Sequence, residues 1–455
     1  MIHKIKTKAI LDIPRYGAAG DADGWVTYEP QIVSARWERN DHRKGDRLSI
    51  TIAHRDGGVD PRLIKNARIL FYLWDDNQED FDSTKHLRFA GICDEAERAL
   101  DGDDRHVTMT FHDYTVLFSE TPQYPQQGIP EWSDTLDTAW KKICDHTGWF
   151  NVETGQIESS VTALRDRLVL RLSRPVTMIG EMTADRFHKL SKPAFAGAKS
   201  SWDVWQSIVG ALGLVSYIDK DRCIVTEPHV LYDESKALQF LYGHNVLAWK
   251  ETASTKAAMS TGVIMYAFNS STGKMLEAAY PPPGDPRVKM RTQKKRAKGV
   301  NLESPEALNQ VSTHYERFAA PSGVIDQAVL GYIARATWEE RSRQEISGSL
   351  RTAETTLFTG DGVSRASIFD LGAGSPIRVG FDDESYETLS AMSDAERMRH
   401  LVERAGYTPD VAKLVLQNMA SEELKPVFHV TTMRAKVEPN LFEVELEYHN
   451  RIRVS

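Results

Sequence analysis

The chain has 455 residues, and at roughly 150 residues per domain this length predicts about three domains. Hydrophobic residues make up 41% and charged residues 26%, and 10 Trp, 15 Tyr and 16 Phe supply large apolar side chains, so the composition excludes a disordered chain. Lys and Arg number 56 against 64 Asp and Glu, a net charge of −8, which argues against nucleic-acid binding through a general excess of positive charge.

The cysteines and the apolar runs indicate where the chain folds. Cys93, Cys144 and Cys223 are odd in number and lie far apart, so they do not predict a disulfide framework, and a reducing compartment is favoured. Residues 1–17 lack the apolar core and small-residue cleavage site of a signal peptide, and no stretch approaches the ~20 apolar residues that a bilayer span needs. We therefore expect a protein without a membrane span that folds in a cytoplasm.

Residues 1–120 have the alternating pattern of an antiparallel β-meander. Apolar residues alternate with Ser, Thr or His, except in residues 67–74, which are apolar throughout, as expected of a strand covered on both faces. Asp101-Gly102-Asp103-Asp104 lacks the spacing of a calcium loop and is interpreted as a hairpin turn. The pattern predicts five strands and favours a sandwich or barrel, with strands at 31–39, 46–54, 67–74, 87–99 and 105–118.

Residues 121–245 differ in texture and predict a mixed α/β region. Residues 138–150 align with 203–215, and both segments have helical apolar spacing that ends in a Gly. Ser200 to Asp203 has the S-x-x-D form of a capping box, and residues 214–228 predict a β-hairpin.

From residue 246 onward the pattern is again mainly β. Prolines at 281–283 precede a basic segment, so 281–300 is predicted to be a loop. An amphipathic helix is predicted at 324–343, and two short helices at 387–405 and 409–420 form a predicted insertion at 384–424. Two strands are predicted within 246–269, and further strands at 346–358, 375–380, 427–436 and 440–453. In the last of these, Phe442, Val444 and Leu446 alternate with Glu443, Glu445 and Glu447, which predicts one buried and one strongly acidic face.

Three short motifs in a fixed order carry a resemblance to known proteins. They are Asp60-Pro61-Arg62-Leu63, then Phe89-Ala90-Gly91-Ile92-Cys93-Asp94, then His112-Asp113-Tyr114-Thr115 with Leu117. In this order they resemble the opening domain of phage baseplate hub proteins of the late-control protein D family, which includes the hub portion of type VI secretion spike proteins. The two helix–Gly–strand units, the late helix and the strand start at Gly374-Ser375-Pro376 follow in the family's order, so the resemblance covers most of the chain.

The resemblance implies an α+β, β-rich fold with two tail-tube-like antiparallel β-barrel domains joined by a mixed α/β middle domain. We expect a first barrel at 1–120, the middle domain at 121–245 and a second barrel at 246–455. The second barrel would carry the basic loop at 281–300 and the helical insertion at 384–424, both of which depart from the family pattern.

The resemblance also implies a structural role without enzymatic activity or a cofactor. A homotrimeric ring, to which each chain supplies two tube-like barrels, would adapt the hexameric tail tube to a trimeric spike and form part of the DNA-ejection channel. The spike is expected to be a separate chain, because the sequence reaches Ser455 without Val-Gly octapeptide repeats. Further expected partners are the tail tube protein, other baseplate proteins and a tape measure protein. The expected location is the virion, at the tail tip or baseplate, after assembly in the host bacterial cytoplasm.

Two charged segments are the candidate partner contacts. The segment 287–298 is basic with no acidic residue, and it is interpreted either as a solvated loop or as a strap onto an acidic partner surface, with sequence-specific nucleic-acid binding disfavoured. The C-terminal half of the helix at 324–343 alternates charge sign, as polar contacts between subunits would. The candidate residues are Arg287, Lys289, Arg291, Lys294, Lys295, Arg296, Lys298, Glu339, Glu340, Arg341 and Arg343.

No pattern in the sequence predicts a catalytic or metal site. His106 and His112 share strand parity but lack a third ligand, and no H-E-x-x-H or G-x-S-x-G motif is present. Two alternatives to the phage hub remain open. One is the hub of a bacterial contractile injection system, and the other is a tail-associated cell-wall hydrolase, for which the helical insertion is too short to form a catalytic domain.

Overall fold

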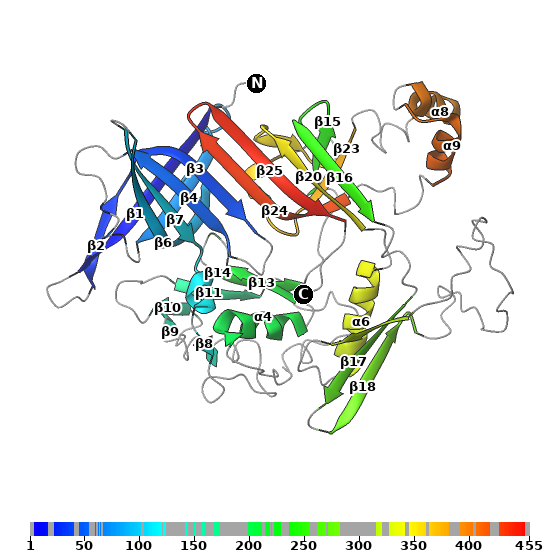
Figure 1. Cartoon of the computed structure of the whole chain (residues 1–455), viewed down its shortest axis with the longest axis horizontal. Helices are drawn as coiled ribbons and strands as arrows, with labels where there is room; N and C mark the ends of the chain where they lie inside the picture. Colours follow the sequence, from blue (N-terminus) through cyan, green and yellow to red (C-terminus); the bar gives the residue numbers. More distant parts are fainter. Residues whose placement is uncertain are drawn as a thin grey trace.

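A computed structural model of the chain is shown in Figure 1. It describes residues 4–16, 22–40, 45–53, 60, 62, 64, 67–101, 104–120, 122–123, 142–143, 150–151, 156–159, 167–172, 199–211, 214–218, 220, 223–228, 236–254, 262–269, 272–282, 315–320, 327–341, 345–360, 364–381, 392–403, 406–418 and 427–450.

A 13-stranded sheet is the largest element of the fold and crosses the upper part of Figure 1. Its strands follow the order β16-β20-β25-β24-β3-β4-β7-β6-β5-β1-β2, with β23 also beside β24 and β15 beside β23. The N-terminal strands are β1 (Ile5–Tyr16), β2 (Ala22–Tyr28), β3 (Ile32–Arg39), β4 (Arg47–Ala53), β5 (Arg68–Asp75), β6 (Leu87–Asp101) and β7 (Asp104–His112). The C-terminal strands are β15 (Leu238–Tyr242), β16 (Ala248–Ser254), β20 (Glu345–Thr352), β23 (Pro376–Phe381), β24 (Val427–Glu438) and β25 (Leu441–His449).

The alternation in the sequence explains which side chains these strands bury. Leu48, Ile50 and Ile52 of β4 are fully buried, whereas the residues between them are half-buried, as expected of a strand with one face on the core. In β5 the continuous apolar run is covered on both faces near its end, as predicted. The turn at 101–104 is also confirmed, because Asp101 and Asp104 are paired where β6 meets β7.

The two halves of the chain share one hydrophobic core. Trp37 and Phe71 from the N-terminal strands belong to the same buried cluster as Phe240, Met433 and Leu446 from the C-terminal strands. The backbone ladder between β3 and β24 joins the halves directly, with Trp37 opposite Ala435. The large sheet and its core therefore pass without a break from one half to the other.

The strand order of the first half is repeated in the second half. The series β3-β4-β7-β6 corresponds to β16-β20-β25-β24, and every neighbouring pair in both series is antiparallel. The fourth strand of each series has a register shift, between Cys93 and Glu95 in β6 and between Val430 and Thr432 in β24. Before the shift, β6 pairs with β5 and β24 pairs with β23. The chain thus contains two copies of one five-strand arrangement.

The first two strands were missed in the sequence. The expected meander began at residue 31, but β1 and β2 precede it and form the far end of the large sheet. The signal was present, because Ile5, Ala9 and Leu11 lie on one face of the strand and Lys6 and Lys8 lie on the other, and Ala9 and Leu11 are buried.

The middle region is mixed α/β, as its pattern predicted. A five-stranded sheet has the order β13-β14-β11-β10-β9, and helix α4 (Ser201–Ala211) packs against β13. The capping box is confirmed, with Ser200 Oγ donating to the Asp203 carboxylate at 2.8 Å. Trp205 is fully buried and donates from Nε1 to Ser216 Oγ at 2.8 Å. The strands are β9 (Phe150–Asn151), β10 (Gln156–Ser159), β11 (Arg167–Leu172), β13 (Leu214–Ile218) and β14 (Cys223–Pro228).

A smaller three-stranded sheet lies between β16 and β20 in the sequence. Its order is β18-β17-β19, with β17 (Gly262–Asn269), β18 (Lys274–Tyr280) and β19 (Tyr315–Ala319), and helix α6 (Gln327–Arg341) packs against β17 and β18. Tyr280 and Trp338 meet edge to face across this contact. Two strands were predicted in 246–269 and both are present, but they belong to different sheets.

The predicted helical insertion is present as a pair of helices with a small core of its own. Helices α8 (Asp394–Glu403) and α9 (Pro409–Asn418) bury Leu401 against Ala412. Ser393 and Glu396 cap the start of α8, and Gly406 has a positive φ of 74° in the turn between the helices. In Figure 1 the pair lies apart from the sheets. The remaining short elements are α1 (Thr115–Ser119), β8 (Pro122–Gln123), β12 (Lys199–Ser200), β21 (Thr356–Phe358), β22 (Arg365–Ser367) and the 3-10 helix η4 (Ile368–Asp370).

Candidate functional site

One face of the large sheet is polar across both halves of the chain. The opposite face packs on the shared core, so alternate positions of each strand point to this polar face. Its members include Lys250 and Thr252 of β16, Ser347, Ser349 and Arg351 of β20, Glu443, Glu445 and Glu447 of β25, Thr432, Arg434 and Lys436 of β24, Arg36 and Glu38 of β3, Arg47, Ser49 and Thr51 of β4, Thr108 of β7, and Glu95 and Glu97 of β6.

Charges of opposite sign alternate along one row of this face. The row runs perpendicular to the strands and crosses the ladder between β3 and β24. Its members stand directly opposite one another in register, in the order Arg351, Glu445, Arg434, Glu38 and Arg47. Directly opposed charges of unlike sign stabilise a sheet, and the row therefore favours this register over its alternatives.

Arg434 is the centre of the row. Its Nε lies 3.1 Å from Glu38 Oε1, and its Nη1 lies 2.6 Å from Glu447 Oε1. The hydrogen bond to Glu447 and the neighbouring carboxylates raise the pKa of the Arg434 guanidinium. Glu443, the first glutamate of β25, pairs with Arg351 at 3.4 Å. The closing strand was expected to show a strongly acidic face, but arginines of the adjacent strands partly neutralise its carboxylates.

Two further arginines tie the halves together on the core side. Arg39 of β3 donates to the carbonyl oxygen of Leu371 at 2.6 Å. Arg88 of β6 is buried and donates to Asp370 at 2.8 Å, and its guanidinium lies 5.2 Å from the ring centre of Phe369. Burial lowers the pKa of Arg88, and the Asp370 carboxylate opposes that effect. The η4 segment and the residue after it are thus held by β3 and β6, the first and last strands of the series β3-β4-β7-β6.

The motif at 112–115 contacts Gly45 and Asp46, just before β4, and leads into α1. Asp113 accepts hydrogen bonds from the backbone N–H groups of Asp46 at 2.8 Å and Thr115 at 2.9 Å. A Cβ added at Gly45 would meet the Asp113 carboxylate, which explains the glycine. Burial raises the pKa of Asp46 to about 7, although Arg39 acts in the opposite direction, and burial also raises the pKa of Asp113.

The motif at 89–94 contacts the motif at 112–115. A Cβ added at Gly91 would clash with the carbonyl oxygen of His112 and with the Phe89 ring, so only glycine fits. Asp94 Oδ2 lies 3.3 Å from His112 Nε2. Two of the three motifs that carry the resemblance therefore hold the adjacent strands β6 and β7 together.

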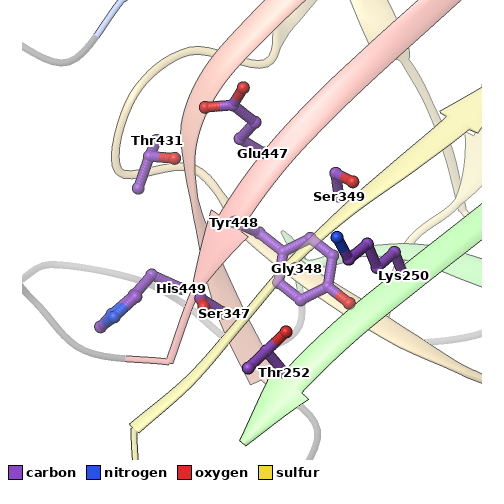
Figure 2. A pocket seen from close by; sticks show the side chains of 9 residues that line it. All are labelled: Lys250, Thr252, Ser347, Gly348, Ser349, Thr431, Glu447, Tyr448 and His449. Carbon is purple, nitrogen blue, oxygen red and sulfur yellow. The ribbon is translucent and has the colours of Figure 1, made fainter.

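A polar recess of about 300 Å³ lies at the β16 end of the polar face, and Figure 2 shows the side chains that line it. Lys250 and Thr252 come from β16, with the Tyr448 ring of β25 between them in this view. Tyr448 accepts from Trp249 Nε1 at 2.6 Å and donates to Glu251 at 3.2 Å, and burial raises its pKa. The other lining residues are Ser347, Gly348, Ser349, Thr431, Glu447 and His449.

The candidate partner residues from the sequence fall mostly outside the described residues. Arg287, Lys289, Arg291, Lys294, Lys295, Arg296, Lys298 and Arg343 lie outside them. The backbone positions of Glu339, Glu340 and Arg341 are in the last turn of α6, but their side chains are not among those described. The polar row and the β3–β24 ladder were not found in the sequence, because neither has a local signature.

His106 and His112 lie on the same face of β7, as predicted, since both are at even positions of the strand. Within the residues that the structure describes, no group of three His, Cys, Asp or Glu side chains could hold a metal ion. In the same part of the chain, no helix is both long and apolar enough to cross a membrane.

The fold resembles that of solved tail proteins. No protein-family model matches the chain, and no curated protein does. The structure of a tail protein from Neisseria meningitidis MC58 is similar with a TM-score of 0.52 and 11% identity, over 97% of this chain and 96% of that one. The 43 kDa tail protein of prophage MuSo2 from Shewanella oneidensis gives a TM-score of 0.51 and 8% identity, over 97% and 98% of the two chains. At these identities the similarity concerns the fold.

Proposed function

We propose that the protein is a structural component of a phage tail, a baseplate hub whose three copies form a ring between the tail tube and a central spike. The observation that carries this proposal is the repeat within the chain: the order β3-β4-β7-β6 recurs as β16-β20-β25-β24, and the copies are joined by the β3–β24 ladder. The similarity to tail proteins over nearly the whole chain supports it at the level of the fold.

The repeat provides a physical reason for a trimer. Three chains with two similar units each present six similar units around one axis, which suits a hexameric tube on one side, while the threefold chain symmetry suits a trimeric spike on the other. Each unit would be a tube-like barrel, the first within 1–120 and the second within 246–455, with the region 121–245 between them on the outside of the ring. Ring closure would also cover strand edges that a monomer leaves open.

The polar face would line the channel of this ring. Its row of Arg351, Glu445, Arg434, Glu38 and Arg47 contains both signs of charge in fixed pairs. Paired charges leave little net field to attract a passing polyanion, so DNA could move through without strong attachment. No enzymatic step and no cofactor is needed for this role.

The native mass of the purified chain, alone and mixed with the spike protein encoded nearby, tests the proposal. We expect a species of three chains, formed by the protein alone or on addition of the spike, and a ring in negative-stain images. A chain that remains a monomer in both conditions would overturn the hub assignment.

A further inference from the structure

Within the described residues, each of the two repeated series leaves one stretch of strand edge without a partner. One is the outer edge of β16, the last strand of the large sheet. The other is the distal part of β6, because β5 pairs with residues 87–92 of that strand and residues 95–101 pair with β7 alone. Lys250, Glu251 and Thr252 of β16 and Glu95, Glu97 and Arg98 of β6 are all exposed.

The internal repeat shows what the distal part of β6 should bind. Its counterpart is the distal part of β24, because the register shift at Cys93 and Glu95 matches the shift at Val430 and Thr432. That part of β24 pairs with β3, the first strand of the other series. The first strand of the second series is β16, so β16 is the partner that the repeat assigns to β6.

One chain cannot make this contact with itself. Seven strand steps separate β16 from β6 in the sheet, roughly 34 Å at the usual spacing between strands. Figure 1 shows the two strands at opposite sides of the sheet. The β16 that pairs with β6 must therefore belong to a second copy of the chain.

We propose that β16 of one copy adds antiparallel to residues 95–100 of β6 in the next copy, which repeats the β3–β24 ladder between chains. Alignment of the two series gives the register of this contact between β16 and β6. Arg36, Trp37 and Glu38 of β3 correspond to Lys250, Glu251 and Thr252 of β16, and Arg434, Ala435 and Lys436 of β24 correspond to Glu97, Arg98 and Ala99 of β6. The paired residues are then Glu97 with Thr252, Arg98 with Glu251, and Ala99 with Lys250.

The charges agree with this register. It places Arg98 directly opposite Glu251, and Glu97 diagonally from Lys250 on the same face, so both pairs are of unlike sign. A slip of one residue in one direction would instead oppose Glu97 to Glu251 and Arg98 to Lys250, two repulsive pairs. A slip in the other direction opposes no charges. The alignment used strand order and register shifts only, so this charge complementarity is an independent argument.

Neighbouring side chains fix the position of the Glu251 carboxylate. It accepts a hydrogen bond from Tyr448 Oη at 3.2 Å, and Tyr448 is fixed in turn by Trp249. On the other strand, Arg98 lies 3.7 Å from Asp60 in an exposed ion pair, which leaves donors of its guanidinium for a second carboxylate.

A charge exchange tests the contact. We expect Arg98→Glu or Glu251→Arg alone to lower the ratio of trimer to monomer about tenfold, because every chain-to-chain joint of a closed ring would then oppose like charges. The double variant R98E/E251R should restore the trimer. Arg62→Glu is the matched control, since Arg62 also pairs with Asp60 but lies off the proposed ladder. Circular dichroism of each variant establishes that it is folded.

A cysteine pair tests the register. Glu97→Cys with Thr252→Cys places the thiols at opposed positions, and oxidation should link chains into dimers and trimers on a non-reducing gel. Arg98→Cys with Thr252→Cys is offset by one residue and should not, because the two side chains then point to opposite faces.

The contact rests on the proposed ring, yet the two can fail separately. A wild-type trimer that is indifferent to the charge exchange and gives no cross-link would leave the ring in place and overturn the β6–β16 contact. A rescued exchange in a trimer that binds neither spike nor tube protein would support the contact and overturn the hub function. A wild-type monomer under all conditions would overturn both.

Discussion

Arg434 and Glu38 are 396 residues apart in the chain and form an ion pair across the β3–β24 ladder, with 3.1 Å between Nε and Oε1. The pair lies on the polar face, directly above the core that the two halves share. Arg434 also makes ion pairs with Glu445 and Glu447, and Glu38 is the next-to-last residue of β3. The stability of the joint should therefore respond to this side chain.

Substitution of Arg434 by Met should destabilise the chain by about 1–2 kcal/mol, because Glu38, Glu445 and Glu447 would lose the cation that lies between them. Urea unfolding measures the loss. Lys436→Met is the control, since Lys436 is exposed and pairs with Glu438 on its own strand. Equal unfolding free energies for the two variants would contradict a special role of Arg434.

The carboxyl of Asp46 should make stability depend on pH. Burial raises its pKa from 3.8 to about 7, so between about pH 4 and pH 7 the folded chain holds a proton that the unfolded chain has released. The stability that this group contributes is therefore lost as the pH rises through that window. The unfolding free energy of Asp46→Asn minus that of the wild type should be about 1–2 kcal/mol larger at pH 8 than at pH 5. Urea unfolding at both pH values measures this difference. Parallel pH profiles for the two proteins would exclude the effect, and the exposed Asp80→Asn serves as control.

Gly91→Ala should cost about 2–4 kcal/mol or prevent soluble expression, because the added methyl would clash with the His112 carbonyl oxygen in the adjacent strand. Gly331→Ala in α6 is the matched control. A Cβ at Gly331 meets nothing within 4 Å, and the exchange should stabilise the helix by about 0.5–1 kcal/mol. Thermal unfolding compares the two. A Gly91→Ala protein as stable as the wild type would show that the strands can move apart there.

Replacement of residues 392–418 by a short Gly-Ser linker should leave the rest of the fold intact. The helices α8 and α9 pack Leu401 on Ala412 in a cluster separate from the main core. We expect the main unfolding midpoint to shift by no more than about 2 °C. Leu401→Ala in the full chain should loosen the helix pair without lowering that midpoint. A large drop in either variant would show that the pair supports the sheet.

Local features of the fold could be predicted from the sequence because they depend on nearby residues. The alternation in β4, the hairpin at 101–104 and the capping box at Ser200 and Asp203 each result from periodicity or from contacts within a few residues. The pairing of β3 with β24 could not be predicted in this way, because no local pattern specifies a partner several hundred residues away. For the same reason the sequence predicted two strands within 246–269 but not that they lie in different sheets, with β17 beside β18 and β19.

The candidate site was less predictable than the fold. In the sequence Arg434 is one cation among 56 Lys and Arg, and its importance depends on three glutamates that the sheet brings to it. The basic segment at 287–298 was prominent because its positive charges are close together in the sequence, which is a property of composition rather than of folding. Charged residues that pair across strands can be recognised only when the register of those strands is known.

The ladder between β3 and β24 has a consequence for how a ring of such chains would respond to dilution. Of the six joints between similar units in the proposed ring, three lie within chains. The two strand edges of such a joint belong to one covalent chain, so their effective concentration does not depend on the protein concentration. These three persist at any protein concentration. The other three follow mass action, so a dilute solution should contain intact pairs of units and never single ones.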